Sequence, residues 1–432
     1  MPSKNTGDFI AALDLGSNSF HLIVARRNDV GYQVIDKHKE TVRLASGFDE
    51  QGNLKQETIG KAVKALERLG ERVRKIPSRN LRIVGTNTLR KAKNAAVLIE
   101  AAESVLGHSV DVIAGAEEAR LIFSGVTRGL NLEDRKYLVI DIGGGSTEII
   151  AGYYEKPELL NSLHMGCISV TLNHFPHGML SRESFDAAHI SVAQELEPIL
   201  RSYKEYGWDE VIGSSGTVLA IKDMLVKNSW DREGITIRGL NCLTKYLIKK
   251  GSTRALNLKG LSNNRKGILA GGLAILNSFC KEMGIERLSV SDNALREGVL
   301  NDLVGRIKNQ DIRDTTVKKF LDLYELDAAQ SLRVNDTADY IFNCLKNSWG
   351  LSKIEHLRYL NWAASLSEIG LTVSFSQFHK HGAYLLRNLD MPGFSEKEKK
   401  ILSLLVRAQR RKFPTREFLY LNPSEKEKLV KI

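Results

Sequence analysis

Apolar runs and amphipathic segments alternate along the first 150 residues of the chain. Residues 9–16 and 20–26 are nearly continuous apolar runs, which predicts a pair of strands. Residues 56–76 place apolar side chains at intervals of three and four, which predicts an amphipathic helix. The alternation then continues with a strand and turn, a helix, and a strand, turn and helix, in residues 81–90, 95–107 and 110–126. This order is typical of an α/β fold.

After a polar linker in residues 131–136, mixed strand and helix patterns continue to about Ile307, and the character changes beyond Asp311. Segments with helical periodicity and almost no strand pattern then follow, in residues 329–349, 356–370 and 396–413. The last charged segment resembles the start of a further helix. We therefore predict two α/β domains and one helical domain, in residues 1–128, 129–310 and 311–432.

Composition narrows the class of protein. The 42% hydrophobic and 26% charged residues among 432 are typical of a soluble globular protein. No run approaches the roughly 20 apolar residues of a membrane span, and the N-terminus lacks the pattern of a secretory signal. The four cysteines show no CxxC spacing, which favours free thiols in a reducing compartment. We expect a cytoplasmic protein without an integral membrane segment.

The net charge of +11 predicts a polyanionic partner, such as a phosphate-rich small molecule, an anionic lipid or a nucleic acid. Zinc-finger spacing, RNP-type aromatic motifs and a basic region followed by heptads are absent from the sequence. We therefore do not expect specific recognition of nucleic acid.

One short pattern occurs twice. DLGSNSFHLIV begins at Asp14 and DIGGGSTEIIA begins at Asp141, so that Asp14, Gly16, Ser19 and His21 align with Asp141, Gly143, Ser146 and Glu148. Each copy reads as strand, turn of small residues, strand. Such a turn lets successive backbone N–H groups converge on an anion, and the neighbouring carboxylate suits Mg²⁺ beside phosphate. Either copy alone could be an ordinary hairpin, whereas two copies together predict a clamp on a phosphate chain.

Several motifs occur in the order and spacing of the exopolyphosphatase / guanosine pentaphosphate phosphohydrolase family, which the chain resembles. They are DLGSNSFHL (14–22), GTNTLR (85–90), GAEEARLIFSGV (115–126), DIGGGSTE (141–148), MGCISVT (165–171), GSSGT (213–217) and NALREGVL (293–300). A weaker match, residues 363–394, extends into the helical domain. The resemblance implies an α/β fold of the duplicated actin-like (ribonuclease H-like) ATPase type in two domains, followed by an all-helical HD-like domain.

The resemblance also implies roles for individual residues. Glu118 matches the catalytic glutamate that positions and deprotonates the attacking water; Glu117 is the alternative. Arg90 matches the arginine on the phosphate under attack, although a surface salt bridge would also explain it. Asp141 and Glu148 match the Mg²⁺-associated acids. The remaining expected phosphate contacts are Ser17, Asn18, Ser19, Gly143, Gly144, Gly145, Ser146, and a third turn of Gly213, Ser214, Ser215, Gly216 and Thr217.

Two features of the remaining sequence favour structural interpretations. His21 lies between apolar neighbours on a strand, so we interpret it as a core or rim histidine. In the helical domain, Ser367 stands where HD-type relatives often carry histidine, and His379 and His381 do not share one helical face. We expect no metal site there, and interpret the domain as a wall and a dimer surface. A basic track for polyphosphate remains open, with Lys91, Lys93, Arg407, Arg410, Arg411, Lys412 and Arg416 as its candidates.

The resemblance implies a Mg²⁺-dependent exopolyphosphatase that releases orthophosphate from inorganic polyphosphate, and GGGS and SDNALREG resemble that branch more closely. The alternative is removal of the 5′ γ-phosphate of guanosine pentaphosphate. A kinase or chaperone-type ATPase, and a non-catalytic sensor, are less favoured. The family implies a homodimer. Longer members of the family continue into a further C-terminal domain, and we expect no such domain after Ile432. We therefore expect hydrolysis of short substrates, whereas processive degradation of long polyphosphate chains is an open question.

Overall fold

In the computed structural model, the strands that carry the two repeated motifs are buried on both faces, which explains their continuous apolar sequences. The structure describes residues 9–28, 31–128, 130, 134–232, 234–351, 354–420 and 423–432. The chain divides into two compact units, Met1–Ile307 and Lys308–Ile432. The predicted boundary after residue 128 adjoins residue 129, and the predicted linker includes 131–133, all of which lie outside the described residues.

The first sheet of the larger unit has the strand order β3-β2-β1-β4-β5. β1, β2 and β3 form an antiparallel meander, and β4 and β5 continue the sheet parallel to β1. The predicted strand pair is confirmed as β1 and β2. The elements of this half are β1 (Phe9–Leu15), β2 (Ser19–Arg27), β3 (Tyr32–Thr41), α1 (Gln56–Val73), β4 (Leu81–Gly85), α2 (Asn87–Lys91), α3 (Ala95–Leu106), β5 (Asp111–Val112) and α4 (Gly115–Thr127). The predicted turn after β4 is instead the short helix α2.

The second sheet repeats this plan, with the order β8-β7-β6-β9-β11-β10. β6, β7 and β8 are again an antiparallel meander, and β9 and β11 again continue in parallel. The duplication predicted from two short motifs is therefore confirmed at the level of whole sheets. The strands are β6 (Lys136–Ile142), β7 (Thr147–Tyr153), β8 (Lys156–Leu163), β9 (Glu210–Ser214), β10 (Ile235–Thr236) and β11 (Arg287–Val290).

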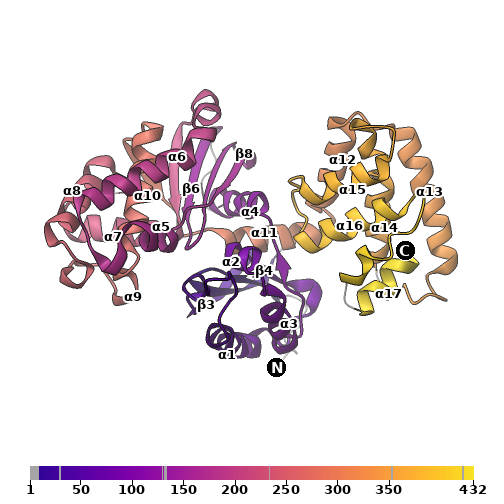
Figure 1. Ribbon diagram of the computed structural model, residues 1–432, viewed down its shortest axis with the longest axis horizontal. Coiled ribbons are helices and arrows are strands. Elements are labelled where there is room, and N and C mark those ends of the chain that lie inside the picture. Colours follow the sequence, from indigo (N-terminus) through magenta and orange to yellow (C-terminus); the bar gives the residue numbers. More distant parts are fainter. Residues whose placement is uncertain are drawn as a thin grey trace. The chain divides into compact units, whose positions relative to one another are not determined.

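Helices cover both faces of each sheet (Figure 1). In β6, Leu138 and Ile140 belong to the core under one helical layer, whereas Val139 belongs to the core on the opposite face. Side chains alternate across a strand, so burial on both faces requires apolar residues at nearly every position. The helices of this half are α5 (Cys167–His174), α6 (Arg182–Tyr206), α7 (Ser215–Lys227), α8 (Ile237–Lys250), α9 (Asn263–Lys266), α10 (Leu269–Met283) and α11 (Leu295–Ile307).

Helices α4 and α11 share one core with strands of both sheets and so hold the two halves of the larger unit together. The two helices cross closely. A Cβ atom on Gly298 of α11 would lie 1.7 Å from the backbone oxygen of Leu121 on α4, so only glycine permits this approach. The last helix of the second predicted domain thus packs on the last helix of the first.

The smaller unit consists of helices, and its described residues contain no β-strand. Its principal core includes Phe320, Trp362, Leu386 and Phe394. The helices are α12 (Ile312–Leu323), α13 (Ala328–Leu345), α14 (Ile354–Ser365), α15 (Phe378–Asn388), α16 (Glu396–Ala408) and α17 (Pro423–Lys431), which confirms the predicted change of character and the final helix. Across the described part of the chain, every helix is too short or too polar to cross a membrane.

Candidate active site

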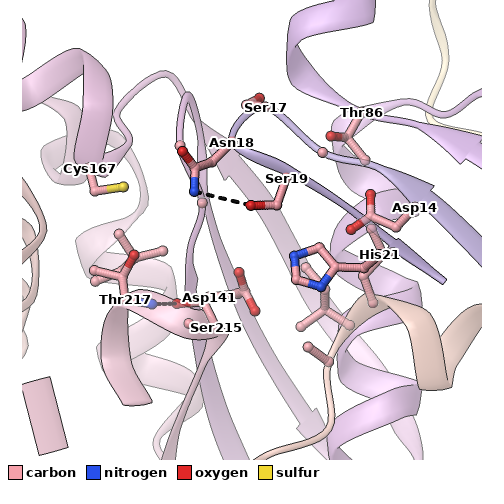
Figure 2. Close-up of a pocket in the computed structure, with 18 of the residues that line it drawn as sticks. Asp14, Ser17, Asn18, Ser19, His21, Thr86, Asp141, Cys167, Ser215 and Thr217 are labelled. Atoms are coloured by element: carbon pink, nitrogen blue, oxygen red, sulfur yellow. Dashed lines mark hydrogen bonds between the residues drawn. The ribbon is translucent and has the colours of Figure 1, made fainter. Parts of the chain in front are cut away.

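Both repeated hairpin turns line one cavity of about 180 Å³ in the larger unit (Figure 2). The first turn contributes Ser17, Asn18 and Ser19 after β1, and the second follows β6. Asp14 and Asp141, which precede the turns, line the same cavity. The sequence repeat therefore becomes a spatial pair of loops around one space.

The two loops approach each other through glycine. A Cβ atom on Gly144 would lie 3.1 Å from Cβ of Ser17, and one on Gly145 would lie 2.7 Å from Oδ1 of Asn87. Any side chain at Gly145 would push against the opposite half of the unit. This close approach answers why the second loop has no side chains at these positions.

Backbone carbonyls of both loops accept hydrogen bonds from the segments that follow. Ser17 O accepts from the amide of Ala45 at 2.9 Å, and Gly144 O accepts from the amide of Ile168 at 2.9 Å. In a trans peptide the next N–H points opposite to the carbonyl. The amides of Asn18 and Gly145 therefore point away from these bonding segments, which leaves one backbone N–H in each loop as a candidate donor to an anion.

Helix α2 explains the GTNTLR motif. Thr88 Oγ1 donates to Ser17 Oγ over 2.8 Å, and Asn87 lies against Gly145. Arg90 Nη1 donates to Oε2 of Glu118 over 2.7 Å and to the backbone oxygen of Ile113 over 2.8 Å. One turn of helix therefore contacts both loops and the predicted catalytic glutamate.

Glu118 and its alternative, Glu117, occupy different environments in the first turn of α4. Glu118 is buried and lines the cavity. Glu117 forms a two-fold pair with Arg120, at 2.7 and 2.8 Å, within a buried ion-pair network that includes Asp302. Only Glu118 of the two is placed where it can contact a bound phosphate or water.

Four carboxyl groups line this cavity without an equal number of bonded cations: the buried Glu118, Asp141 and Glu148, and the half-buried Asp14. Burial first, then the charge of Glu118, raises the pKa of Asp14 to about 8. Burial raises the pKa of Asp141 to about 6, against the opposing 2.6 Å hydrogen bond from Ser214 Oγ. Burial, together with Glu118 and Asp141, also raises the pKa of Glu148 well above its usual value. The cluster is thus short of positive charge at neutral pH.

These groups fit a divalent cation shared with a substrate. Asp14 Oδ1 is buried and has no hydrogen-bond partner among the described residues, so it retains an unused acceptor. The described side chains do not bring three ligands into coordinating distance of one point. Mg²⁺ commonly uses one or two protein carboxylates and completes its shell with water and phosphate oxygens. Asp141 and Glu148, with Asp14 nearby, are chemically suited to that partial ligand set.

The third predicted turn, GSSGT, is a junction between β9 and α7 rather than a hairpin. Ser215, Gly216 and Thr217 line the cavity at the first turn of α7. Ser215 has a φ of 87°, which is unfavourable for a residue with a side chain and occurs mainly at constrained functional positions.

Most of the predicted site residues meet at the cavity: Ser17, Asn18, Ser19, Glu118, Asp141, Gly143, Gly144, Ser146, Glu148, Ser215, Gly216 and Thr217. Among the described lining residues, Arg90, Gly145, Gly213 and Ser214 are absent. Arg90 instead holds Glu118, Gly145 lies against Asn87, and Ser214 holds Asp141. Gly213 lies inside β9 against Val218 and Leu288.

Sequence reasoning missed several cavity residues. Lys39, Arg265 and Arg296 add three cations to the lining, and His21, predicted as a core or rim histidine, lines the cavity. Arg296 lies within a recognised motif, so that motif was an available signal. Lys39 on the edge strand β3 and Arg265 on α9 belong to no motif, and only folding brings them to the loops.

Comparison with known proteins agrees with this geometry. Residues 23–307 match the Ppx/GppA phosphatase family, and residues 312–432 match domain III of Ppx/GppA phosphatases. The chain belongs to the Ppx/GppA phosphatase family. It is thus a hydrolase acting on phosphoanhydride bonds, and the enzyme class predicted from the motifs is confirmed.

The chain is similar to Ppx/GppA proteins from several bacteria. It is 39% identical to the guanosine-5′-triphosphate,3′-diphosphate pyrophosphatase of Aeromonas hydrophila, over 97% of this chain and 83% of that protein. It is 38% identical to the protein of the same name from Pseudoalteromonas translucida, over 95% and 81%. An exopolyphosphatase structure from Cytophaga hutchinsonii has a TM-score of 0.63 at 24% identity, and the match covers 69% of this chain and 98% of that one. A Ppx/GppA structure from Aquifex aeolicus has a TM-score of 0.58 at 24% identity, and the match covers 70% of this chain and 98% of that one. These structures share the fold of this chain over the part that they cover.

Proposed function

We propose that this protein hydrolyses the terminal phosphoanhydride bond of inorganic polyphosphate and releases orthophosphate. The observation that carries the proposal is the pair of small-residue loops that line one cavity together with four carboxyl groups. Backbone amides and hydroxyls of the loops suit the oxygens of a phosphate chain, and the acids suit the cation that accompanies it.

In the proposed reaction, the loops hold the terminal phosphate and Glu118 orients a water molecule against its phosphorus atom. The water oxygen bonds to phosphorus, the bond from phosphorus to the bridging oxygen breaks, and Glu118 accepts a water proton. The products are orthophosphate and a chain one phosphate shorter. Mg²⁺ bound by Asp141 and Glu148, directly or through water, would neutralise charge on the phosphate oxygens. Arg90 keeps Glu118 in position through their 2.7 Å ion pair.

The lining chemistry supports an inorganic chain as the first candidate substrate. The described residues of the cavity offer amides, hydroxyls and the cations Lys39, Arg265 and Arg296, and they include no phenylalanine, tyrosine or tryptophan ring for a base. Recognition by such groups depends on phosphate alone.

Guanosine pentaphosphate is the second candidate, because the relatives at 38 and 39% identity carry the name of a pyrophosphatase for that nucleotide. Its terminal 5′ phosphate would occupy the same loops, with the nucleoside outside the cavity. The bond broken would be of the same type.

The test is phosphate release from long-chain polyphosphate and from guanosine pentaphosphate, assayed side by side with Mg²⁺ and again with EDTA. Faster Mg²⁺-dependent release from polyphosphate would support the proposed order of substrates. Phosphate release from the nucleotide alone would make guanosine pentaphosphate the substrate. The absence of phosphate release in both assays would reject the proposed reaction. Glu118→Gln provides the blank for contaminating phosphatases.

A further inference from the structure

The helical unit contains a second cavity, of about 490 Å³, which we call the helical-unit cavity. It lies between the segment that leads into α15 and the end of α16. The described residues that line it are Phe375, Ser376, Gln377, Phe378, His379, Lys380, Arg407, Arg410, Arg411 and Lys412. All of them belong to the smaller unit, so the cavity does not depend on the hydrolytic site.

The lining of this cavity is positively charged. Five lysine and arginine side chains border the cavity, and no aspartate or glutamate is among its described lining residues. Arg407 is paired with Glu417, whose Oε1 lies 3.5 Å from Nε of the arginine. Clustered cations with so little neutralisation raise the local concentration of anions, and arginine is well suited to bidentate binding of phosphate.

Two polar atoms in the lining are buried and unused. His379 is 3% exposed, and its Nδ1 has no hydrogen-bond partner in the part of the chain that the structure describes. The same holds for Nη1 of Arg407. A buried polar atom without a partner is unfavourable by about 1–3 kcal/mol, which a ligand that bonds to it would recover. Burial, followed by the neighbouring arginine and lysine charges, lowers the pKa of His379, so an uncharged ring faces the cations.

Aromatic groups stand beside these cations. The guanidinium of Arg410 lies over the ring of Phe378, 5.3 Å from its centroid. Phe375 is 77% exposed, an unusual condition for phenylalanine that leaves its ring face available. Nucleic-acid bases stack on such rings and on arginine planes, with about 1–3 kcal/mol per base. Gln377 and Ser376 add side-chain groups able to bond to base edges.

We propose that the helical-unit cavity binds a phosphorylated nucleotide, with its phosphates on Arg407, Arg410 and Arg411 and its base against Phe375. The cations alone would suit any phosphate chain, whereas the exposed ring and the amide side chain offer stacking and hydrogen bonds to a base. The cavity thus provides a site for a nucleotide effector, separate from the loops that hold the substrate.

The experiment is photolabelling of the full-length protein with 8-azido-ATP, followed by identification of the labelled peptides. We expect labelling within residues 375–380 or 407–412, protected by excess ATP. Phe375→Ala and Arg410→Ala should each reduce that labelling at least 10-fold. Matched controls are Tyr384→Ala, which removes an exposed ring of the same helical region, and Arg416→Ala, which removes a cation of the same basic segment outside the cavity. Both controls should label as the wild type does.

Three results would overturn the proposal. Labelling confined to peptides of the hydrolytic cavity would remove the second site. Full labelling of Phe375→Ala would remove the base-stacking role. Protection by inorganic tripolyphosphate as effective as protection by ATP would assign the cavity to phosphate chains in general. Because phosphate release by the larger unit is measured separately, failure here leaves the proposed hydrolytic function untouched.

Discussion

Arg90 and Glu118 form a buried ion pair, with Nη1 of the arginine 2.7 Å from Oε2 of the glutamate. The arginine comes from α2 and the glutamate from α4, and a second bond from Arg90 to the backbone of Ile113 fixes the guanidinium. From the sequence, an arginine close to two lysines is as consistent with an exposed surface charge as with a contact to phosphate. Its burial beside a cavity glutamate favours a role in positioning that glutamate, and contact with phosphate remains a prediction.

Replacing Glu118 by glutamine should reduce turnover by about 100- to 10,000-fold, because the amide cannot accept the proton of the attacking water. Substrate binding should be nearly unchanged, since the shape of the side chain is kept. Steady-state phosphate release and equilibrium binding of the substrate measure the two effects. Glu117→Gln is the matched control: it breaks the buried pair with Arg120 and should lower the melting temperature, but the folded variant should retain its turnover. A wild-type rate in Glu118→Gln would exclude this residue from the mechanism.

Replacing Arg90 by lysine should lower kcat by about 10- to 100-fold, because a misplaced catalytic group loses much of its effect and lysine cannot serve Glu118 and Ile113 together in a planar fork. KM should change less, since Arg90 does not line the cavity in this structure. Lys75→Met removes an exposed charge outside the recognised motifs and the candidate basic track, and should behave as the wild type. A large rise in KM with unchanged kcat would instead assign Arg90 to substrate binding.

Gly145→Ala should weaken phosphate binding, seen as a KM raised at least several-fold. The new methyl group would meet Asn87 Oδ1 at 2.7 Å, and the loop would have to move away from its partner. Gly267→Ala is the control, because its Cβ would meet nothing within 4 Å and its backbone is not in the left-handed region. Recovery of KM in Asn87→Ala/Gly145→Ala would identify the clash as the cause, whereas an unchanged KM in the single variant would contradict the close approach of the loops.

The stability of the metal-free protein should fall as pH rises from about 4 to 8. Asp14 and Asp141 have pKa values of about 8 and about 6 in the fold, above the usual value of 3.8. The folded chain therefore binds more protons than the unfolded chain in that pH window. The stabilisation that this proton binding provides is complete below the unfolded pKa of 3.8, and it is lost as the pH rises through the pKa values of the folded chain. Because one pKa unit corresponds to about 1.4 kcal/mol, the two raised pKa values together predict a loss of several kcal/mol in the free energy of unfolding across this window.

Mg²⁺ should counteract this loss by compensating the acidic cluster, and Asp14→Asn should make the metal-free protein more stable at pH 8 and less dependent on pH. Urea unfolding at several pH values, with Mg²⁺ or EDTA, measures these effects. Stability that rises with pH in EDTA would show that these acids do not carry the raised pKa values.

The helices and strands of the larger unit were largely predictable, because each follows from a local pattern. The runs that form β1 and β2 are almost continuously apolar because both faces of the sheet are buried. The run that forms α1 has the spacing of an amphipathic helix. The predicted turn after this strand was wrong: β4 ends at Gly85, and Thr86 leads directly into helix α2. Five residues are too few for a period to appear, and the helix is held by contacts with Ser17, Gly145 and Glu118.

Some residues of the candidate site could be predicted from local sequence motifs, and the environment of others depends on tertiary packing. Ser17, Asp141 and Glu118 were recognisable because each lies in a motif whose small or acidic residues have no use in a buried strand or helix. The sequence indicates a core or rim histidine at His21, and the structure pairs it across β1 and β2 with Asp14, in the position that Glu148 holds opposite Asp141. That pairing places it in the cavity lining, near Arg296, whose Nη1 lies 3.4 Å from its Nδ1. The environment of a side chain depends on what the next strand and a distant helix place beside it.

By itself, the sequence determined the duplicated strand-turn-strand motifs, the helical character of the last part and the acids of the site, because glycine runs, periodicity and charge are local properties. Only the tertiary structure decided that the two loops meet through Gly144 and Gly145, that Lys39 and Arg265 complete the lining, and that the basic residues near the C-terminus surround a cavity with exposed phenylalanine. These relationships join residues far apart along the chain. They arise from packing, which brings such residues together through contacts that no short stretch of sequence encodes.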